Sequence, residues 1–361
     1  MIAAHLSVDL AAVCDNWRLL CAQADPRTRC AAVVKADAYG LGAPQVATAL
    51  YRAGCREFFV ALVDEGLQLR SHIPADARLF VLHGALPGAE AECVAHGLIP
   101  VLNSLDQVAR WRGLARSGGT ALRAALQVDT GMARLGLSAV DVDRLDAAAL
   151  AGIEPVLLMS HLVAAEEPAN PINEAQLRCF EAARKRWPGL PCSLANSSGV
   201  FLGKAWHFDL LRPGAALYGV APTLGRANPM RPVVRLQARL IQSHWVQDEG
   251  GVGYNHTWQA EGRRRIATVS VGYADGYLRS LSNRATLRFQ GVAVPLVGRV
   301  SMDTVTVDVT QIDEARLVPG ALFDLIDGVH DINALAAEAG TNAYEILTSL
   351  GPRYRRTYLD S

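Results

Sequence analysis

The stretch CAAVVKADAYGLGAPQVATALYRAGCREFFVALV, residues 30–63, contains one complete strand–helix–strand unit. Its two apolar runs, CAAVV and EFFVALV, are short and rich in β-branched or aromatic residues, which predicts buried strands. Pro44 and Gly54 bracket the segment between them, because proline favours the first turn of a helix and glycine the position just past its end. Strands joined through a helix are predicted to pair in parallel.

The same unit repeats along the first two thirds of the chain. Including CAAVV, eight strand candidates occur: 30–34, 57–63, 78–84, 98–103, 123–129, 155–161, 192–196 and 208–212. Most of the gaps carry helix-patterned sequence, such as SLDQVARWRGLAR at 104–116 and INEAQLRCFEAARKRW at 172–187. Eight such units predict an α/β fold with a TIM-like (β/α)8 barrel, and an open doubly wound sheet is the alternative.

After about residue 230 the sequence changes character. Runs of β-branched residues separated by Gly-rich turns replace the helical periodicity, as in RIATVSV at 265–271 and DTVTVDVT at 303–310. We therefore expect two domains: residues 1–230 form the barrel, and residues 231–361 form a mainly β C-terminal domain.

The composition limits the class of protein. The 361 residues carry 35 Lys plus Arg and 35 Asp plus Glu, so no net charge favours nucleic acid or an anionic membrane as partner, and a small ligand is expected. No apolar stretch is long enough to span a membrane, and the N-terminus lacks a signal-peptide pattern, which predicts a cytoplasmic protein. The seven cysteines show no metal-ligand spacing, so no metal site is predicted.

Polar residues stand where the predicted strands end. The carboxyl ends of all barrel strands open on one face, so these side chains are expected to converge there. They are Lys35, Asp129, His161, Asn196, Ser197 and Arg212.

Lys35 is the candidate with the clearest chemistry. A desolvated amine at a strand end is suited to a Schiff base with an aldehyde, although a lysine that reaches solvent there is the structural alternative. The following ADAYGLG segment is small and Gly-containing, which lets backbone approach a ligand and places Tyr39 one turn beyond the amine. RPGAALYG from Arg212 could present backbone N–H groups to a phosphate.

The segment VVKADAYGLG at 33–42 resembles the cofactor-lysine motif of the alanine racemase family, which uses pyridoxal phosphate. Five further segments resemble that family in the same order: QVDTGMARLG from Gln127, LANSSG from Leu194, RPGAALYG, VGYADGY from Val271 and GRVSMD from Gly298. The resemblance therefore covers essentially the whole chain.

The resemblance implies a role for each matched residue. Lys35 would hold pyridoxal 5'-phosphate and act as one base, and Tyr254 of GGVGYNHTW would be the opposite base, against the alternative of a packing tyrosine. Arg212 would contact the pyridine nitrogen, unless it pairs with a surface carboxylate instead. The other implied residues are Tyr39, Asn196, Ser197, Gly214 and Ala215 for the cofactor and its phosphate, His161 beside the ring, Arg134 and Met302 for the substrate carboxylate, and Tyr273 and Asp303 at the entrance.

The family also implies a homodimer in which each barrel mouth is completed by the partner's second domain. The implied reaction interconverts L-alanine and D-alanine by a two-base mechanism, as an isomerase that supplies D-alanine for peptidoglycan or catabolises it. The alternatives are a non-catalytic pyridoxal-phosphate carrier and a racemase or decarboxylase of other amino acids. An arginine at the pyridine position speaks against the decarboxylase.

Two positions depart from the family pattern. Gln127 stands where some members carry a carbamylated lysine that holds the substrate-binding arginine, so Arg134 needs the amide, a bound anion or another side chain to position it. Pro352 stands where some members supply a tyrosine to the phosphate, with Tyr354 close by.

Overall fold

The computed structural model describes residues 3–360, and its contacts divide the chain into two compact units. One unit is Val13–Met230, and the other combines the chain up to Ala12 with the residues from Arg231 onward. Among the described residues, no helix is both long and apolar enough to cross a membrane.

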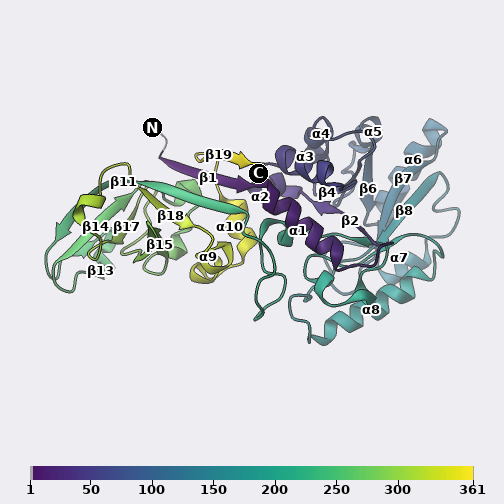
Figure 1. The fold of residues 1–361 in the computed structure, drawn as a ribbon. Coiled ribbons are helices and arrows are strands. Elements are labelled where there is room, and N and C mark those ends of the chain that lie inside the picture. Colours follow the sequence, from purple (N-terminus) through teal and green to yellow (C-terminus); the bar gives the residue numbers. More distant parts are fainter. Residues whose placement is uncertain (1–2, 361) are drawn as a thin grey trace. The chain divides into compact units, whose positions relative to one another are not determined.

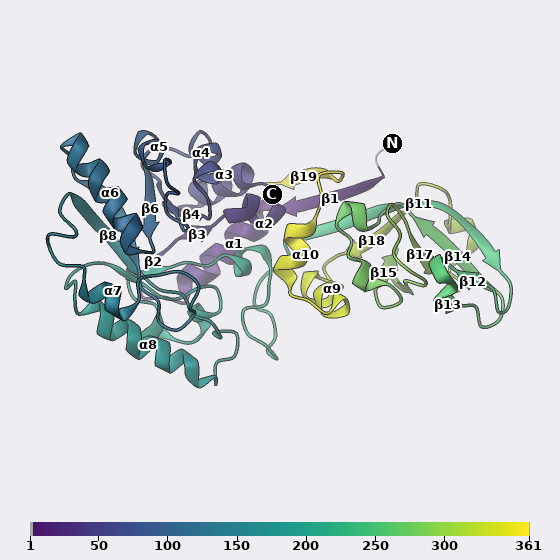
Figure 2. The same cartoon turned by 180° about the vertical axis from the view of Figure 1, so that it is seen from behind.

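The Val13–Met230 unit contains the eight predicted strand regions, and its helices lie on the outside of the strands (Figures 1 and 2). The strands are β2 (Arg29–Cys30), β3 (Ala32–Val33), β4 (Glu57–Val60), β5 (Arg78–Val81), β6 (Leu98–Leu102), β7 (Leu122–Gln127), β8 (Ile153–Met159), β9 (Cys192–Ser193) and β10 (Leu210–Leu211). The helices are α1 (Leu10–Ala22), α2 (Lys35–Gly40), α3 (Ala43–Ala53), α4 (Val63–Arg70), α5 (Glu90–Ala95), α6 (Leu105–Gly118), α7 (Ala139–Asp143) and α8 (Pro171–Arg184).

The strands form a closed ring. β3 to β9 make one parallel sheet in sequence order, and β10 pairs with β2, which continues into β3. Backbone hydrogen bonds from Asp209 N to Cys192 O at 2.9 Å and from Arg212 N to Ala195 O at 3.0 Å join β10 to β9. The structure thus confirms the barrel and rejects the open sheet.

Apolar side chains from alternate positions of the strands fill the barrel. Phe59 and Phe80 stack there with ring centroids 4.6 Å apart. The buried cluster consists of Ala31, Val33, Phe59, Phe80, Ile99, Val101, Ala125, Leu157, Met159 and Leu210. Because the interior is packed, a ligand has room only at the strand ends.

The second unit is mainly β, as predicted. Its strands are β1 (Ala4–Asp9), β11 (Val234–Val246), β12 (Gly251–Val252), β13 (Trp258–Gln259), β14 (Arg264–Val269), β15 (Thr286–Phe289), β16 (Val292–Pro295), β17 (Val305–Asp308), β18 (Leu322–Ile326) and β19 (Arg355–Leu359). Two helices, α9 (Ile332–Ala339) and α10 (Ala343–Ser349), belong to the same unit.

The first strand does not belong to the barrel, which differs from the expectation that residues 1–230 form one domain. β1 runs antiparallel to β11 and parallel to β19, so it lies inside the sheet of the second unit. Its residues alternate between buried and half-buried, the pattern of a strand with one covered face. The pairing with β11 and β19, rather than the position of β1 in the chain, places this strand in the second unit.

Candidate active site

Lys35 lies just beyond the carboxyl end of β3, with a half-buried side chain. Burial lowers the pKa of its amine, and the positive charge of Arg134 lowers it further, while Glu65 opposes both. More of this amine is therefore neutral near pH 7 than for a solvated lysine. A neutral amine is what a Schiff base or a general base requires.

The residues that follow Lys35 form a left-handed turn. Ala36, Asp37, Ala38 and Tyr39 have φ values of 51°, 53°, 53° and 58°. Each non-glycine residue in this region costs roughly 1–2 kcal/mol, so surrounding contacts must stabilise the turn. The turn carries Tyr39 back to within 4.8 Å of the Tyr218 ring, measured between centroids.

Glu65 of α4 stabilises the start of this turn. Its Oε1 accepts from Ala36 N at 2.7 Å, and its Oε2 accepts from Ala61 N at 2.7 Å and from Leu62 N at 3.2 Å. One carboxylate thus holds the Lys35 loop against the end of β4. Nothing in the sequence singles out Glu65, because its partners are backbone groups that leave no motif.

We expect Glu65→Ala to lower both stability and activity. The substitution removes the acceptor of three backbone N–H groups at exposed or half-buried positions, and a hydrogen bond contributes about 0.5–1.5 kcal/mol on average. Urea unfolding measures the stability, and the reaction rate reports the placement of Lys35 and Tyr39. Asp64→Ala is the matched control, since Asp64 is the exposed neighbour on the same helix. Equal behaviour of the two variants would contradict this role of Glu65.

The residues predicted for a phosphate come together at the ends of β9 and β10. Ser197 Oγ accepts from Gly214 N at 3.0 Å and from Ala216 N at 3.1 Å. An ideal Cβ at Gly214 would lie 2.5 Å from the Tyr39 hydroxyl oxygen, so only glycine leaves room for that hydroxyl. Asn196 Oδ1 instead accepts from Gly199 N at 2.9 Å, which shapes the loop. Backbone donors, two hydroxyls and a glycine are typical of an anion site.

Arg212 is buried at the end of β10 with 4% of its surface exposed. Its guanidinium donates to the Ser193 hydroxyl and to the Ser160 carbonyl. Burial lowers its pKa to about 9, and no carboxylate of residues 3–360 makes an ion pair with it. The alternative of a surface ion pair is therefore wrong. A charged, buried guanidinium remains available to a hydrogen-bond acceptor in the mouth.

His161, at the end of β8, stays neutral. Burial lowers its pKa to about 3, helped by the positive charges of Arg212, Arg134 and Lys35. Gln176 of α8 holds the loop, donating to His161 O at 2.9 Å and to Thr130 Oγ1 at 3.1 Å. A neutral imidazole can lie beside an aromatic ring without adding charge.

Arg134 lies on the loop after β7 with an exposed side chain. The Asp129 carboxylate holds this loop by accepting from the backbone N–H groups of Gly131, Met132 and Ala133 at 2.9 to 3.2 Å. Gln127 Nε2 donates to Leu135 O at 3.1 Å, so its amide binds backbone rather than the guanidinium. Within residues 3–360, no hydrogen bond or ion pair of the Arg134 guanidinium is formed.

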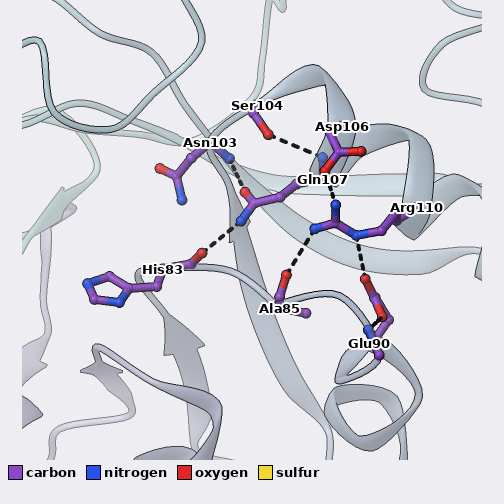
Figure 3. A network of polar contacts seen from close by, with 9 residues as sticks. His83, Ala85, Glu90, Asn103, Ser104, Asp106, Gln107 and Arg110 are labelled. Atoms are coloured by element: carbon purple, nitrogen blue, oxygen red, sulfur yellow. Dashed lines mark hydrogen bonds and ion pairs between the residues drawn. The ribbon is translucent and has the colours of Figure 1, made fainter.

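A cavity of about 430 Å³ lies beside Arg134, which is its only cationic lining residue. The start of α6 also lines this cavity, and there the Gln107 side chain bridges Asn103 N and His83 O at 2.7 and 2.8 Å (Figure 3). Asn103 is 6% exposed, and its Nδ2 donates to Leu82 O at 3.0 Å and Val101 O at 2.9 Å. Its Oδ1 is buried and accepts no hydrogen bond.

The second unit presents three of the predicted residues on its surface. Tyr254 is 68% exposed, Met302 54% and Tyr273 43%. Tyr273 and Met302 are neighbours, because Tyr273 N donates to Ser301 O and Ala274 N donates to Met302 O, both at 3.0 Å. Such exposure of large side chains argues against a packing role for Tyr254 and is typical of a binding surface.

Asp303 and the C-terminal segment lie in the same unit. Asp303 forms an ion pair with Arg353 at 2.8 Å between Oδ1 and Nη1. Pro352 is exposed, whereas Tyr354 is buried with 4% exposure and its hydroxyl forms no hydrogen bond within residues 3–360. Tyr354 therefore packs inside its own unit.

Comparison with known proteins decides the family. The model of the alanine racemase N-terminal domain matches residues 8–222, and that of the C-terminal domain matches residues 233–358. The chain belongs to the alanine racemase family. The alanine racemase of Rhodospirillum rubrum is 52% identical over 98% of this chain and 96% of its own. A catabolic alanine racemase of Agrobacterium fabrum is 49% identical, covering 98% and 92%.

Solved alanine racemases share the whole fold. The enzyme of Bartonella henselae, determined with covalently bound pyridoxal phosphate, matches with a TM-score of 0.95 and 38% identity over 99% of this chain and 100% of its own. The alanine racemase of Streptomyces coelicolor matches with a TM-score of 0.93 and 34% identity over 99% and 98%. The family predicted from six short motifs is confirmed.

Proposed function

We propose that this chain is a pyridoxal-phosphate-dependent alanine racemase, an isomerase that interconverts L-alanine and D-alanine with Lys35 and Tyr254 as opposed bases. The observation that carries the proposal is the mouth of the barrel. There a lysine of lowered pKa, a buried arginine without a counter-ion and a backbone anion site lie together in a chain of this family.

The residues present fit pyridoxal phosphate. Lys35 supplies the amine for its aldehyde, and Tyr39, Ser197, Gly214 and Ala215 surround the place for its phosphate. Arg212 has a guanidinium that an uncharged ring nitrogen can accept from, and neutral His161 suits the side of the ring. When bound, this cofactor supplies an electron sink that makes the Cα proton of alanine acidic.

Inversion at Cα needs a proton removed from one face and returned on the other. Lys35 Nζ acts on one face and Tyr254 Oη on the opposite face. A guanidinium does not readily give up its proton, so Arg212 would leave the pyridine nitrogen unprotonated. Negative charge at Cα would then be stabilised less than by a protonated ring. The weaker stabilisation disfavours decarboxylation and transamination as side reactions.

Arg134 and the backbone at Met302 bind the alanine carboxylate, since a guanidinium matches a carboxylate with two parallel hydrogen bonds. We infer that Asn103 Oδ1 accepts a hydrogen bond from Arg134 when the carboxylate is bound, although the two groups are not hydrogen-bonded in this structure. Its Nδ2 is fixed by two carbonyls, so its unsatisfied Oδ1 has a fixed direction, and Arg134 lines the same cavity. Gln127 is already engaged by Leu135 O.

Asn103→Ala is expected to raise the KM for alanine about tenfold, with a smaller change in kcat, because a hydrogen bond to a charged group contributes about 1.5–3 kcal/mol. The effect should vanish when Arg134→Ala is already present, since Asn103 acts through that guanidinium. Steady-state kinetics of both single variants and the double variant measure the coupling. Additive effects would contradict the link between the two residues.

The exposed surface of Tyr254, Tyr273 and Met302 supports a homodimer with shared active sites. In this arrangement the second unit of one chain completes the barrel mouth of the other. Tyr254 then comes from the partner, and Tyr273 and Asp303 line the entrance. The enzyme acts in the cytoplasm, where it supplies D-alanine for peptidoglycan or degrades it.

A cofactor carrier without turnover is not favoured, because both family domains are present and the second bears Tyr254. The second domain thus favours an enzyme over a carrier.

One experiment tests both the turnover and the choice of substrate. The protein is incubated with pyridoxal phosphate and single L-amino acids, and the products are separated by chiral chromatography. D-alanine should form faster than any other D-amino acid. Binding of the cofactor without D-alanine would overturn the proposal, and faster formation of a different D-amino acid would reassign the substrate.

A further inference from the structure

The turn that begins at Tyr273 lies directly against the backbone of Met302. Tyr273 N donates to Ser301 O at 3.0 Å, and Ala274 N donates to Met302 O at 3.0 Å. An ideal Cβ at Gly272 would lie 2.3 Å from Met302 O, so only glycine permits this close approach. The turn therefore holds the peptide plane between Ser301 and Met302.

These contacts fix the direction of the Met302 N–H group. The Ser301–Met302 peptide bond is trans, so its C=O and N–H groups point to opposite sides. Ser301 O points toward the turn, where it accepts from Tyr273 N. The Met302 N–H therefore points away from the turn, and no atom of residues 3–360 accepts a hydrogen bond from it. A backbone donor with a fixed direction is suited to bind an anion.

A bridge of two ion pairs holds the turn and this loop together. Asp275 ends the turn with 5% of its surface exposed, and its Oδ2 accepts from Gly272 N at 2.9 Å. Arg353 Nε lies 3.1 Å from Asp275 Oδ1, and Arg353 Nη1 lies 2.8 Å from Asp303 Oδ1. Asp303 follows Met302 directly in the chain. One guanidinium thus ties the turn to the residue next to the Met302 donor.

The segment that carries Arg353 is itself attached to the turn. Gly351 N donates to Asp275 O at 2.9 Å, two residues before Arg353. The planar guanidinium presents its N–H donors in a rigid fork, which lets one side chain hold two carboxylates in a defined geometry. The bridge is therefore anchored at its backbone as well as at its charged end.

We propose that Arg353 is a positioning residue that keeps the Met302 N–H directed at the substrate carboxylate by bridging Asp275 and Asp303. The inference rests on the proposed function, in which the backbone at Met302 binds the carboxylate of alanine. Arg353 acts through this backbone and does not contact the substrate itself. Without the bridge, the loop is free to tilt against the turn and to carry the donor away from the carboxylate.

The test is calorimetric titration of the holoenzyme with propionate, which has the carboxylate and methyl groups of alanine but no amino group. Arg353→Ala should weaken propionate binding about tenfold, because a hydrogen bond to a charged group contributes about that factor or more to affinity. The KM for alanine should rise by a similar factor, with a smaller change in kcat. Arg355→Ala is the matched control, since it removes an equal charge from an exposed position on β19. It should bind propionate as the unmodified protein does.

Asp303→Ala separates the bridge from a simple effect of charge. Removing a carboxylate would by charge alone strengthen the binding of an anion, whereas loss of the bridge weakens it. We expect weaker propionate binding, and the double variant with Arg353→Ala should bind no more weakly than Arg353→Ala alone. Asp303→Ala also keeps the ion pair of Arg353 with the buried Asp275. It therefore serves if circular dichroism shows that Arg353→Ala does not fold.

The outcomes distinguish this inference from the proposed function. Unchanged propionate binding by Arg353→Ala, tighter binding by Asp303→Ala, or no binding by the unmodified protein would overturn the role of Arg353. If the unmodified protein racemises alanine while both variants bind propionate normally, only the role of Arg353 is wrong. If it does not racemise alanine, the proposed function fails, and propionate binding still tests the bridge because it needs no turnover.

Discussion

Replacing Lys35 with alanine will abolish racemisation and the covalent attachment of the cofactor. A positioned base contributes about 10²–10⁴-fold to a rate, and Lys35 also supplies the only amine at the end of the barrel strands among the described residues. The measurement combines the rate of D-alanine formation with borohydride reduction, which fixes any Schiff base irreversibly to the protein.

The matched control is Lys204→Ala, because Lys204 is an exposed lysine whose partner is Asp25 on the surface. This variant should keep the activity and the reducible Schiff base. If Lys35→Ala retained either one, another amine would hold the cofactor and the assignment of the site would be wrong.

Tyr254→Phe will remove one of the two bases and leave the other. The rate of inversion should fall about 10²–10⁴-fold, because no group then exchanges a proton on one face of Cα. In deuterated water the variant should still exchange the Cα proton of one alanine enantiomer, with retention of configuration, since Lys35 continues to act on its own face. Proton NMR measures the exchange of the Cα proton, and chiral chromatography of the same sample measures the rate of inversion.

Tyr344→Phe is the control for a lost hydroxyl, since Tyr344 is another exposed tyrosine of the second unit, 42% exposed on α10. It should racemise at the unmodified rate. Equal exchange of both enantiomers by Tyr254→Phe would show that Lys35 or a third group serves both faces, which contradicts the two-base account.

The barrel could be predicted from the sequence because the patterns that indicate it involve residues adjacent in the chain. Each strand is a short apolar run, and the polar residue that ends it, such as Lys35 or Arg212, is adjacent in the chain. The parallel ring then brings these ends to one face, so the predicted residues of the first unit meet without further information. The roles expected of these residues come from the resemblance of their motifs to the alanine racemase family.

The features that were missed depend on partners far away in the chain. The sequence predicts that β1 belongs to the barrel domain, but its partners are β11 and β19, more than 200 residues later. The left-handed turn after Lys35 has no glycine before Gly40, and Glu65, 29 residues from Ala36, stabilises it. Asn103 showed no signal because only the packed structure leaves its Oδ1 unsatisfied.

A mixing experiment tests the shared two-base site most directly. Lys35→Ala and Tyr254→Phe are each inactive, and their subunits are dissociated, mixed in equal amounts and reassembled. If Lys35 and Tyr254 of one site come from different chains, half of the dimers contain one intact site, and about a quarter of the unmodified activity returns. If both residues of a site came from one chain, every site would lack a base. No activity would then return, and the account would be contradicted.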